Sequence, residues 1–195
     1  MSRFNRRTAL RTLLQDRGDL IVISGLGAPS YDLAACGDEP LDFPLWGAMG
    51  GAAMIGFGLA LAQPDRTVLV VTGDGEMLMG MGSLATIAAH QPPNLRIVVL
   101  DNERYGETGA QRTHTALGTD LAAVARACGI DASTTIHTEA ELVPLREQVH
   151  TLRAPLLAVL KVAAEELPRV LPSRDGVYLT HRLRSALLGA PVHEA

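Results

Sequence analysis

The sequence predicts an α/β fold, a doubly wound parallel sheet with helices on both faces. Short runs of β-branched and other apolar residues alternate along the chain with longer stretches in helical pattern. These runs show no alternation of polar and apolar residues, which is typical of strands that are buried on both faces of a parallel sheet. With 195 residues, 47% of them hydrophobic, the chain can build one domain with a sizeable core.

Each strand is expected where an apolar run meets a turn signal. The run at 20–23 stops at Gly-Leu-Gly-Ala-Pro, and the run at 68–71 stops at Gly-Asp-Gly. Further strands are expected at residues 95–100, 134–136 and 156–162. Helices are expected from about residue 4 to 17, from near 75, and at residues 50–62, 83–90, 120–128 and 140–152. The polar segment 101–118, which contains several glycines, is predicted to be a loop.

The predicted elements divide the chain into one domain and a tail. Residues 1–165 are expected to form a single domain, because the alternation of strands and helices runs without a break through them. The segment that follows has no strong pattern. Residues 166–195 are therefore expected to be a C-terminal extension that packs on the domain or on a partner.

The charge balance argues against a nucleic-acid partner. The formal net charge is −4, whereas proteins that bind nucleic acid carry a basic patch. The densest basic cluster, Arg3, Arg6, Arg7 and Arg11, is short and is expected to be the solvated face of the first helix.

Cysteine usage and the N-terminus indicate a cytoplasmic protein. Cys36 and Cys128 lie far apart, so they form neither a disulfide framework nor a metal knuckle, which fits a reducing compartment. The N-terminal residues lack the apolar run of a signal peptide. Residues 43–64 carry no charge and are long enough to span a membrane, but five glycines interrupt them. A buried helix is preferred there, and no membrane partner is expected.

Two polar motifs follow neighbouring predicted strands. Gly73-Asp74-Gly75 comes directly after one strand, and Asp101-Asn102 comes directly after the next. Glycines on both sides of an aspartate let the backbone approach an anion closely. Carboxylate and amide oxygens suit Mg²⁺, which binds one or two carboxylates together with substrate phosphates. The helix that begins near Gly75 would point its N-terminal amides at a diphosphate.

A Gly-Asp-Gly triplet alone is often a plain turn, but here it is paired with a second motif. Gly-Asp-Gly, then 25 residues, then Asp-Asn resembles the thiamine-diphosphate motif. The run from 47 to 75, GAMGGAAMIGFGLALAQPDRTVLVVTGDG, resembles the cofactor-binding PP domain of 2-oxo-acid decarboxylases. The likeness covers roughly residues 21–118, and it makes the uncharged stretch the buried glycine-rich helix of that domain.

The resemblance implies a role for each matching residue. The implied Mg²⁺ ligands are Asp74, Asn102 and the backbone carbonyl of Arg104. Backbone amides would line the diphosphate of thiamine diphosphate (ThDP) at Gly75, Glu76, Tyr105 and Gly106. Other residues implied to lie against the cofactor are Gly25, Gly47, Ala48 and Gly73.

Met49 and Asp101 each have an alternative to weigh. Met49 matches the apolar residue that holds the cofactor in its bent form, with simple core packing as the alternative. For Asp101 we favour a strand-end cap over a metal ligand.

Among relatives of this kind, the chain is most similar to the phosphonopyruvate and sulfopyruvate decarboxylases. The matching pieces include Trp46-Gly47-Ala48-Met49-Gly50, and Thr108-Gly109-Ala110-Gln111-Arg112-Thr113. The chain departs from them at Ser30-Tyr31-Asp32-Leu33, where they carry Ser-Arg-Glu-Leu, and at Gly80 and Glu107. These departures leave open whether the substrate is a phosphonate or sulfonate, and they do not affect the cofactor.

The resemblance also implies a missing half-site. In the family, a glutamate from a PYR-type domain activates the cofactor, and this chain is used up by one domain. Glu76, Glu103 and Glu107 are expected on the other side of the cofactor, near the diphosphate and the metal. We therefore expect a β-type subunit that decarboxylates a small 2-oxo acid without oxidation. Its partner would be a separate α subunit with a PYR domain, in an α₂β₂ or larger hetero-oligomer.

Other functions remain open at this point. Carboligation to an acetolactate-like product uses the same intermediate, and the chain could instead be a non-catalytic ThDP-binding regulatory subunit. A 2-oxo-acid oxidoreductase subunit is disfavoured because two isolated cysteines cannot hold an iron–sulfur cluster. A nicotinamide enzyme is disfavoured because Gly25-Leu26-Gly27 lacks the third glycine of its motif. Whether Gln111, Arg112 or His114 contacts the substrate is undecided, although for His114 a solvated loop residue is preferred; His90 and His137 are expected at the surface.

Overall fold

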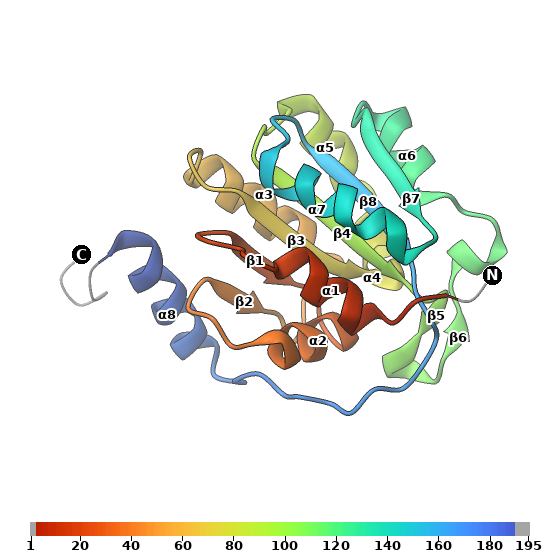
Figure 1. The fold of residues 1–195 in the computed structure, drawn as a ribbon, viewed down its shortest axis with the longest axis horizontal. Coiled ribbons are helices and arrows are strands. Elements are labelled where there is room, and N and C mark those ends of the chain that lie inside the picture. The colour runs from red at the N-terminus through yellow and green to blue at the C-terminus, as the bar shows by residue number, and fades with distance from the viewer. Residues whose placement is uncertain (1–2, 190–195) are drawn as a thin grey trace.

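The computed structural model describes residues 3–189 and has a six-stranded parallel sheet at its centre (Figure 1). The strand order is β2-β1-β3-β4-β8-β7. The strands are β1 (Ile21–Ser24), β2 (Asp42–Pro44), β3 (Val68–Gly73), β4 (Leu95–Asp101), β7 (Ala132–Ile136) and β8 (Leu156–Lys161). A separate antiparallel hairpin is formed by β5 (Arg104–Tyr105) and β6 (Gln111–Arg112).

Helices cover both faces of the sheet, which confirms the doubly wound α/β fold. One hydrophobic core lies under α1 (Arg6–Leu14), α2 (Ala28–Cys36) and α7 (Leu142–Thr151). The other lies under α3 (Ala52–Ala62), α4 (Asp74–Met79), α5 (Ser83–His90) and α6 (Leu121–Cys128). The last helix, α8 (Gly176–Leu188), packs against β2 at the edge of the sheet.

The two cores explain why the strands read as continuous apolar runs. In β3, Val68 and Val70 point into one core, whereas Leu69 and Val71 point into the other. Since successive side chains of a strand face opposite sides, a sheet covered on both faces needs apolar residues at every position.

Glycine allows α3 to pack closely on the sheet. A Cβ atom on Gly56 would lie 2.1 Å from Cγ2 of Val70, so only glycine fits at this crossing. α3 has 11 residues, with Ala53, Gly56 and Phe57 among those buried. Between residues 3 and 189, no helix is long and apolar enough to cross a membrane.

Several elements differ from the sequence prediction. The first helix ends at Leu14 rather than near residue 17, and no element was predicted for the segment that forms α2 and β2. The segment 101–118 contains the β5–β6 hairpin and two short 3₁₀ helices, Gly106–Thr108 and His114–Leu117. α8 was not predicted either, although Asp175 caps it by accepting bonds from the backbone N–H groups of Val177 and Tyr178.

The basic cluster on the first helix is not a solvated face, so that prediction was wrong. Arg6 is buried, and its Nε donates to Oδ2 of Asp32 at 2.5 Å. Arg7 donates to the other oxygen of Asp32 at 3.0 Å. Because α1 packs against α2, a carboxylate on α2 neutralises these arginines inside the interface.

The chain after β8 crosses the surface as an extended strap, residues 163–175, before α8 begins (Figure 1). Arg7 donates to the carbonyl of Pro168 at 2.8 Å, and the indole N–H of Trp46 donates to the carbonyl of Ser173 at 2.7 Å. Arg182 of α8 pairs with Asp38 at 2.5 Å. These contacts hold the strap and α8 against α1, α2 and β2.

Candidate functional site

A cleft of about 650 Å³, partly open to solvent, lies at the carboxyl ends of β1, β3 and β4. In the strand order β2-β1-β3, connections leave β1 and β3 in opposite directions, which is where open α/β sheets bind ligands. Nine of the twelve predicted site residues line this cleft: Met49, Gly73, Asp74, Gly75, Glu76, Asn102, Arg104, Tyr105 and Gly106.

The other three predicted residues do not line the cleft. Gly25 is buried behind its wall, and Gly47 and Ala48 are exposed on the loop before α3. Ala48 has a φ of +57° and Gly50 a φ of +93°, so this loop makes a tight turn. The turn places Met49 at the cleft, 38% exposed and outside both hydrophobic cores, which disfavours core packing as its role.

Asp74 is the first residue of α4 and is 1% exposed. Oγ1 of Thr113 donates to its Oδ2 at 2.5 Å, and Oγ1 of Thr115 lies 3.2 Å from the same oxygen. Burial raises the pKa of Asp74 to about 6, and the nearby charge of Asp101 adds to the rise while the threonine hydroxyls oppose it. A divalent cation at this carboxylate would remove most of that penalty.

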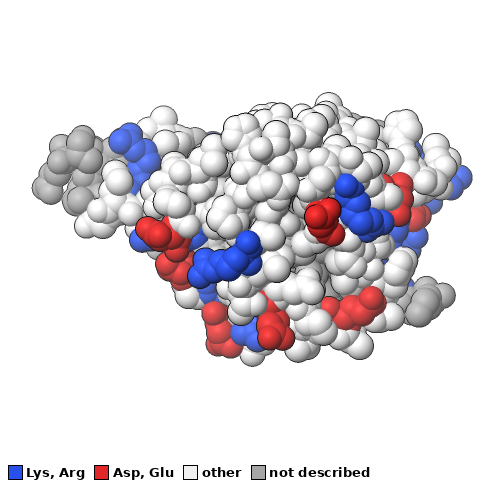
Figure 2. All heavy atoms as spheres, turned by 90° about the horizontal axis from the view of Figure 1, so that it is seen from above, with Lys and Arg blue, Asp and Glu red and all other residues white. Residues whose placement is uncertain are grey.

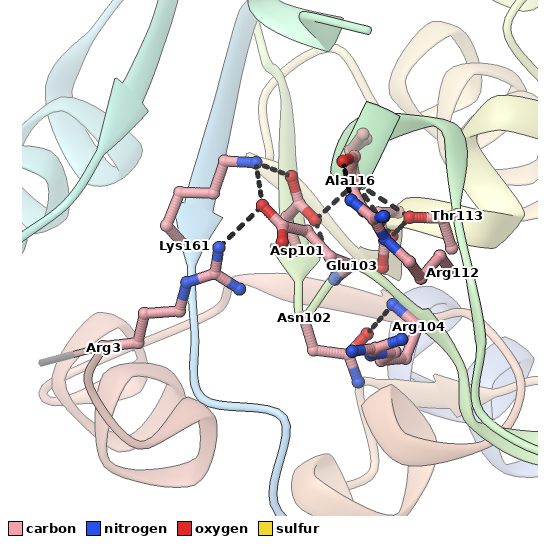
Figure 3. Close-up of polar contacts among 11 residues, drawn as sticks. Arg3, Asp101, Asn102, Glu103, Arg104, Arg112, Thr113, Ala116 and Lys161 are labelled. Atoms are coloured by element: carbon pink, nitrogen blue, oxygen red, sulfur yellow. Dashed lines mark hydrogen bonds and ion pairs between the residues drawn. The ribbon is translucent and has the colours of Figure 1, made fainter. Parts of the chain in front are cut away.

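Asp101, at the end of β4, is fully engaged by protein groups (Figure 3). Its Oδ2 accepts from Nζ of Lys161 at 2.6 Å. Its Oδ1 accepts from the backbone N–H of Glu103 at 3.0 Å and from Oγ1 of Thr115 at 2.8 Å. The predicted strand-end cap is confirmed, and neither oxygen is left over for a metal.

The turn after β4 brings Asn102 to the cleft. Oδ1 of Asn102 accepts from the backbone N–H of Arg104 at 2.9 Å, and Glu103 between them has a φ of +62°. The carboxylate of Glu103 pairs with Arg3 at 2.6 Å and with Lys161 at 3.2 Å (Figure 3). These ion pairs anchor the turn in its left-handed conformation.

Two glycines make room for side chains at the cleft wall. A Cβ on Gly75 would lie 2.5 Å from Cε1 of Tyr105, so the tyrosine ring lies directly on the glycine. A Cβ on Gly25 would lie 1.7 Å from Oε2 of Glu76. A side chain at either position would have to displace Tyr105 or Glu76, so glycine leaves these two side chains the space that they occupy.

Glu76 is the least expected feature of the wall. It is 4% exposed, and Oγ1 of Thr72 donates to its Oε2 at 2.9 Å. Its Oε1 is buried and finds no hydrogen-bond partner in the part of the chain that the structure describes. Burial raises the pKa of Glu76.

Sequence reasoning missed six residues that also line the cleft: Arg6, Leu26, Ala28, Pro29, Leu100 and Thr108. Glu107, which was expected near the diphosphate and the metal, lines the cleft as well. A proline in the first turn of a helix is a known start signal, and Pro29 after Gly27 could have revealed α2 and its open N-terminus. No local signal marks Arg6, which reaches the cleft from α1. Gln111, Arg112 and His114 are exposed and outside the lining. His90 and His137 are also exposed, as predicted.

The oxygen atoms at this cleft fit Mg²⁺ only if a bound ligand supplies the remaining oxygens of its coordination sphere. Across residues 3–189, no group of three or more His, Cys, Asp or Glu side chains could hold a metal by itself. The cleft offers the carboxylate of Asp74, the amide oxygen of Asn102 and backbone carbonyls, and the carboxyl groups of Glu76 and Glu107 also line it. Mg²⁺ sites built with one or two carboxylates and the oxygens of a phosphate have this composition.

Comparison with known proteins gives the following matches. The family model described as "Thiamine pyrophosphate enzyme, C-terminal TPP binding domain" matches residues 31–159. The chain is 45% identical over 115 residues to a sulfopyruvate decarboxylase subunit beta of Methanocaldococcus jannaschii, a match that covers 59% of this chain and 61% of the relative. It is 41% identical over 181 residues to a phosphonopyruvate decarboxylase of Streptomyces viridochromogenes, which covers 88% of this chain and 44% of the relative.

A solved structure agrees with the fold. Benzoylformate decarboxylase from Polynucleobacter necessarius superposes with a TM-score of 0.70 at 17% identity, over 84% of this chain and 34% of that one. At this identity the likeness concerns the fold alone. The chain spans between about a third and two thirds of the length of the relatives that it matches best.

Proposed function

Because this chain belongs to the thiamine pyrophosphate enzyme family, as its C-terminal TPP binding domain, we propose that it is the β-type subunit of a split ThDP-dependent decarboxylase. The observation that carries the proposal is the cleft, where Asp74 and Asn102 meet from the carboxyl ends of β3 and β4. When bound there, ThDP supplies a nucleophilic carbon and an electron sink for the loss of CO₂ from a 2-oxo acid.

The residues of the cleft would bind the cofactor by its charged end. Asp74, Asn102 and the backbone carbonyl of Arg104 would bind Mg²⁺, and the metal would bind the diphosphate. Backbone amides would contact the diphosphate at Gly75, Glu76, Tyr105 and Gly106.

The apolar residues of the cleft would orient the uncharged part of the cofactor and exclude water. Leu26, Met49 and Leu100 line the cleft together with the charged groups. Met49 sits on a tight turn at the cleft and is free to contact a ligand, which supports its role as the residue that holds the cofactor bent.

A partner subunit would complete the site with the activating glutamate of a PYR domain. The name of the M. jannaschii relative, a subunit beta, supports this part of the proposal. So does an uncharged surface: residues 43–64 and 77–95 carry no Asp, Glu, Lys or Arg, and they include α3 and α5. Met54, Leu61 and Met79 are exposed there, and Figure 2 shows a broad area without charged side chains on the side covered by these helices. We infer an α₂β₂ or larger assembly.

The substrate we propose is a small 2-oxo acid with a second acidic group, a sulfonate or a phosphonate. The names of the two relatives support this class. Tyr31 stands where an arginine was expected, but the guanidinium of Arg169 on the strap lies 5.4 Å from the centroid of its ring. Arg169 and Arg104 line a second cavity beside the cleft, so a cation is still available near an anionic substrate.

Two further proposals concern the chain as a whole. We infer that residues 1–165 form the cofactor-binding domain and that residues 166–195 are an extension, of which 190–195 lie outside the described residues. The bond from Arg7 of α1 to the carbonyl of Pro168 supports this inference. A cytoplasmic location is supported by two free cysteines.

The proposal is tested by measuring CO₂ release from sulfopyruvate and phosphonopyruvate with ThDP and Mg²⁺. The chain alone should be inactive, and addition of a PYR-domain subunit from the same organism should restore release. Robust decarboxylation by the chain alone would contradict the split-enzyme proposal. Inactivity of the reconstituted pair toward both acids would contradict the substrate class.

A further inference from the structure

Two threonine hydroxyls lie between the carboxylates of Asp74 and Asp101. Thr113 is 0% exposed and Thr115 is 7% exposed, and their Oγ1 atoms are 2.9 Å apart. On Asp74, both hydroxyls contact the same oxygen, Oδ2. On Asp101, Thr115 contacts Oδ1.

The number of hydroxyl protons decides which of these contacts are hydrogen bonds. Each threonine has one proton to donate, and two carboxylates compete for the two protons. The shortest contacts assign the proton of Thr113 to Asp74, at 2.5 Å, and that of Thr115 to Asp101, at 2.8 Å. With this assignment, no hydroxyl proton remains for the contact of 3.2 Å between Oγ1 of Thr115 and Oδ2 of Asp74, so that contact is not a hydrogen bond.

The loop that carries Asn102 also places Thr113. The backbone N–H of Thr113 donates to the carbonyl of Glu103 at 3.1 Å, and Arg104 pairs with Arg112 across the β5–β6 hairpin. The segment that begins at Asn102 therefore also brings Thr113 back to Asp74. Figure 3 shows Asn102 and Thr113 in this segment.

We propose that Thr113 is a positioning and selectivity residue for the metal: it occupies Oδ2 of Asp74 and leaves only Oδ1 for a cation. A carboxylate that binds through one oxygen suits the small octahedral Mg²⁺, whereas Ca²⁺ accepts bidentate carboxylates and longer bonds. Thr113 therefore favours Mg²⁺ over Ca²⁺. This inference rests on the proposed cofactor site, and it adds the residue that sets the choice of metal.

The test is calorimetric titration of Mg²⁺ and of Ca²⁺ into the full chain with ThDP present. Thr113→Val frees Oδ2, so it should weaken Mg²⁺ binding about tenfold, as loss of a group that orients a metal ligand does. The affinity for Ca²⁺ should fall less than that for Mg²⁺, or should rise. The ratio of the Mg²⁺ affinity to the Ca²⁺ affinity (the Mg²⁺/Ca²⁺ ratio) should therefore decrease. Thr113→Ser keeps the hydroxyl and should keep both the affinity and the ratio.

A matched control comes from the same loop. In the part of the chain that the structure describes, the side chain of Thr119 makes no hydrogen bond, so Thr119→Val should leave both affinities unchanged. Thr113→Ala replaces Thr113→Val should the valine variant fail to fold, as judged by near-UV circular dichroism. Thr115→Val should lower the Mg²⁺/Ca²⁺ ratio less than Thr113→Val, because the proton of Thr115 belongs to Asp101.

The outcomes separate this inference from the proposed function. Wild-type chain that binds Mg²⁺ with ThDP, together with an unchanged Mg²⁺/Ca²⁺ ratio in Thr113→Val, would overturn the role of Thr113 alone. Wild-type chain that binds neither metal in the presence of ThDP would contradict the proposed cofactor site, and the inference would fall with it.

Discussion

At the scale of residues, the site residues that lie at the end of a strand could be predicted from the sequence. Asp74 and Asn102 each follow a buried strand directly, and Asp101 is the last residue of one, so a sequence motif is enough to bring them together. Thr113 and Arg6 also reach this region, but each comes from a separate segment. Their positions depend on how the hairpin folds back and how α1 packs on α2, and no local pattern encodes that.

The raised pKa of Asp74 predicts a particular dependence of stability on pH. A carboxyl whose pKa is about 6 in the folded protein and 3.8 when unfolded stabilises the folded state only while it is protonated. That stability is fully present below pH 4 and is lost as the pH rises through 6. The shift corresponds to a loss on the order of 3 kcal/mol, since one pKa unit is about 1.4 kcal/mol.

Asp74→Asn removes this titration while keeping an oxygen that can accept from Thr113. Urea unfolding without metal measures the free energy of unfolding of both proteins. The value for the variant minus that for the wild-type protein should increase between pH 4 and 6 and stay constant above pH 6. Other titrating groups, such as Glu76 and Asp42, are present in both proteins and cancel. A difference that is flat or that shrinks with rising pH would refute the assignment.

At the scale of elements, strands and helices with a clear apolar pattern were predictable, whereas β2, α2 and α8 were not. β3 and β8 carry apolar runs because each strand serves two cores, and β4 does so apart from Arg96. β2 has three residues, too few to show a pattern. α2 was not predicted because the glycines just before it are typical of a turn. α8 buries only Leu179 and Leu183, so its apolar face is too narrow to predict from sequence.

Two glycines of α3 form a matched pair for testing its packing. Gly56→Ala would place a Cβ 2.1 Å from Val70, whereas a Cβ on Gly58 meets no atom within 4 Å. Gly56→Ala should therefore lower the free energy of unfolding by about 1–3 kcal/mol through overpacking. Gly58→Ala should raise it by about 0.5–1 kcal/mol, the helix propensity gained. Thermal unfolding followed by circular dichroism measures both; equal effects would mean that α3 does not pack on β3 as described.

At the scale of the whole molecule, charge is distributed unevenly over the two faces. Arg6 and Arg7 of α1 share the carboxylate of Asp32 on α2, while α3 and α5 contain no charged residue. An uncharged face beside a cofactor cleft is what a subunit needs if another subunit is to close the site. The proposed assembly thus follows from the surface as well as from the relatives.

The interface is tested with charges at its exposed methionines. Met54→Asp and Met79→Asp should leave the chain folded, because these side chains are 40% and 62% exposed, and should abolish association with the PYR-domain subunit. Val143→Asp, at a residue of α7 that is 65% exposed on the opposite face, is the control and should associate normally. Size-exclusion chromatography with light scattering distinguishes the cases; normal assembly of both methionine variants would place the interface elsewhere.

Asp74 is proposed to hold Mg²⁺ for the diphosphate of ThDP. Titration calorimetry of ThDP into the full chain, with Mg²⁺ and then with EDTA, tests this role. Binding of ThDP should require Mg²⁺ in the wild-type protein and should be lost in Asp74→Ala, while Asp74→Ala remains folded. Undiminished Mg²⁺-dependent binding of ThDP by Asp74→Ala would contradict this role.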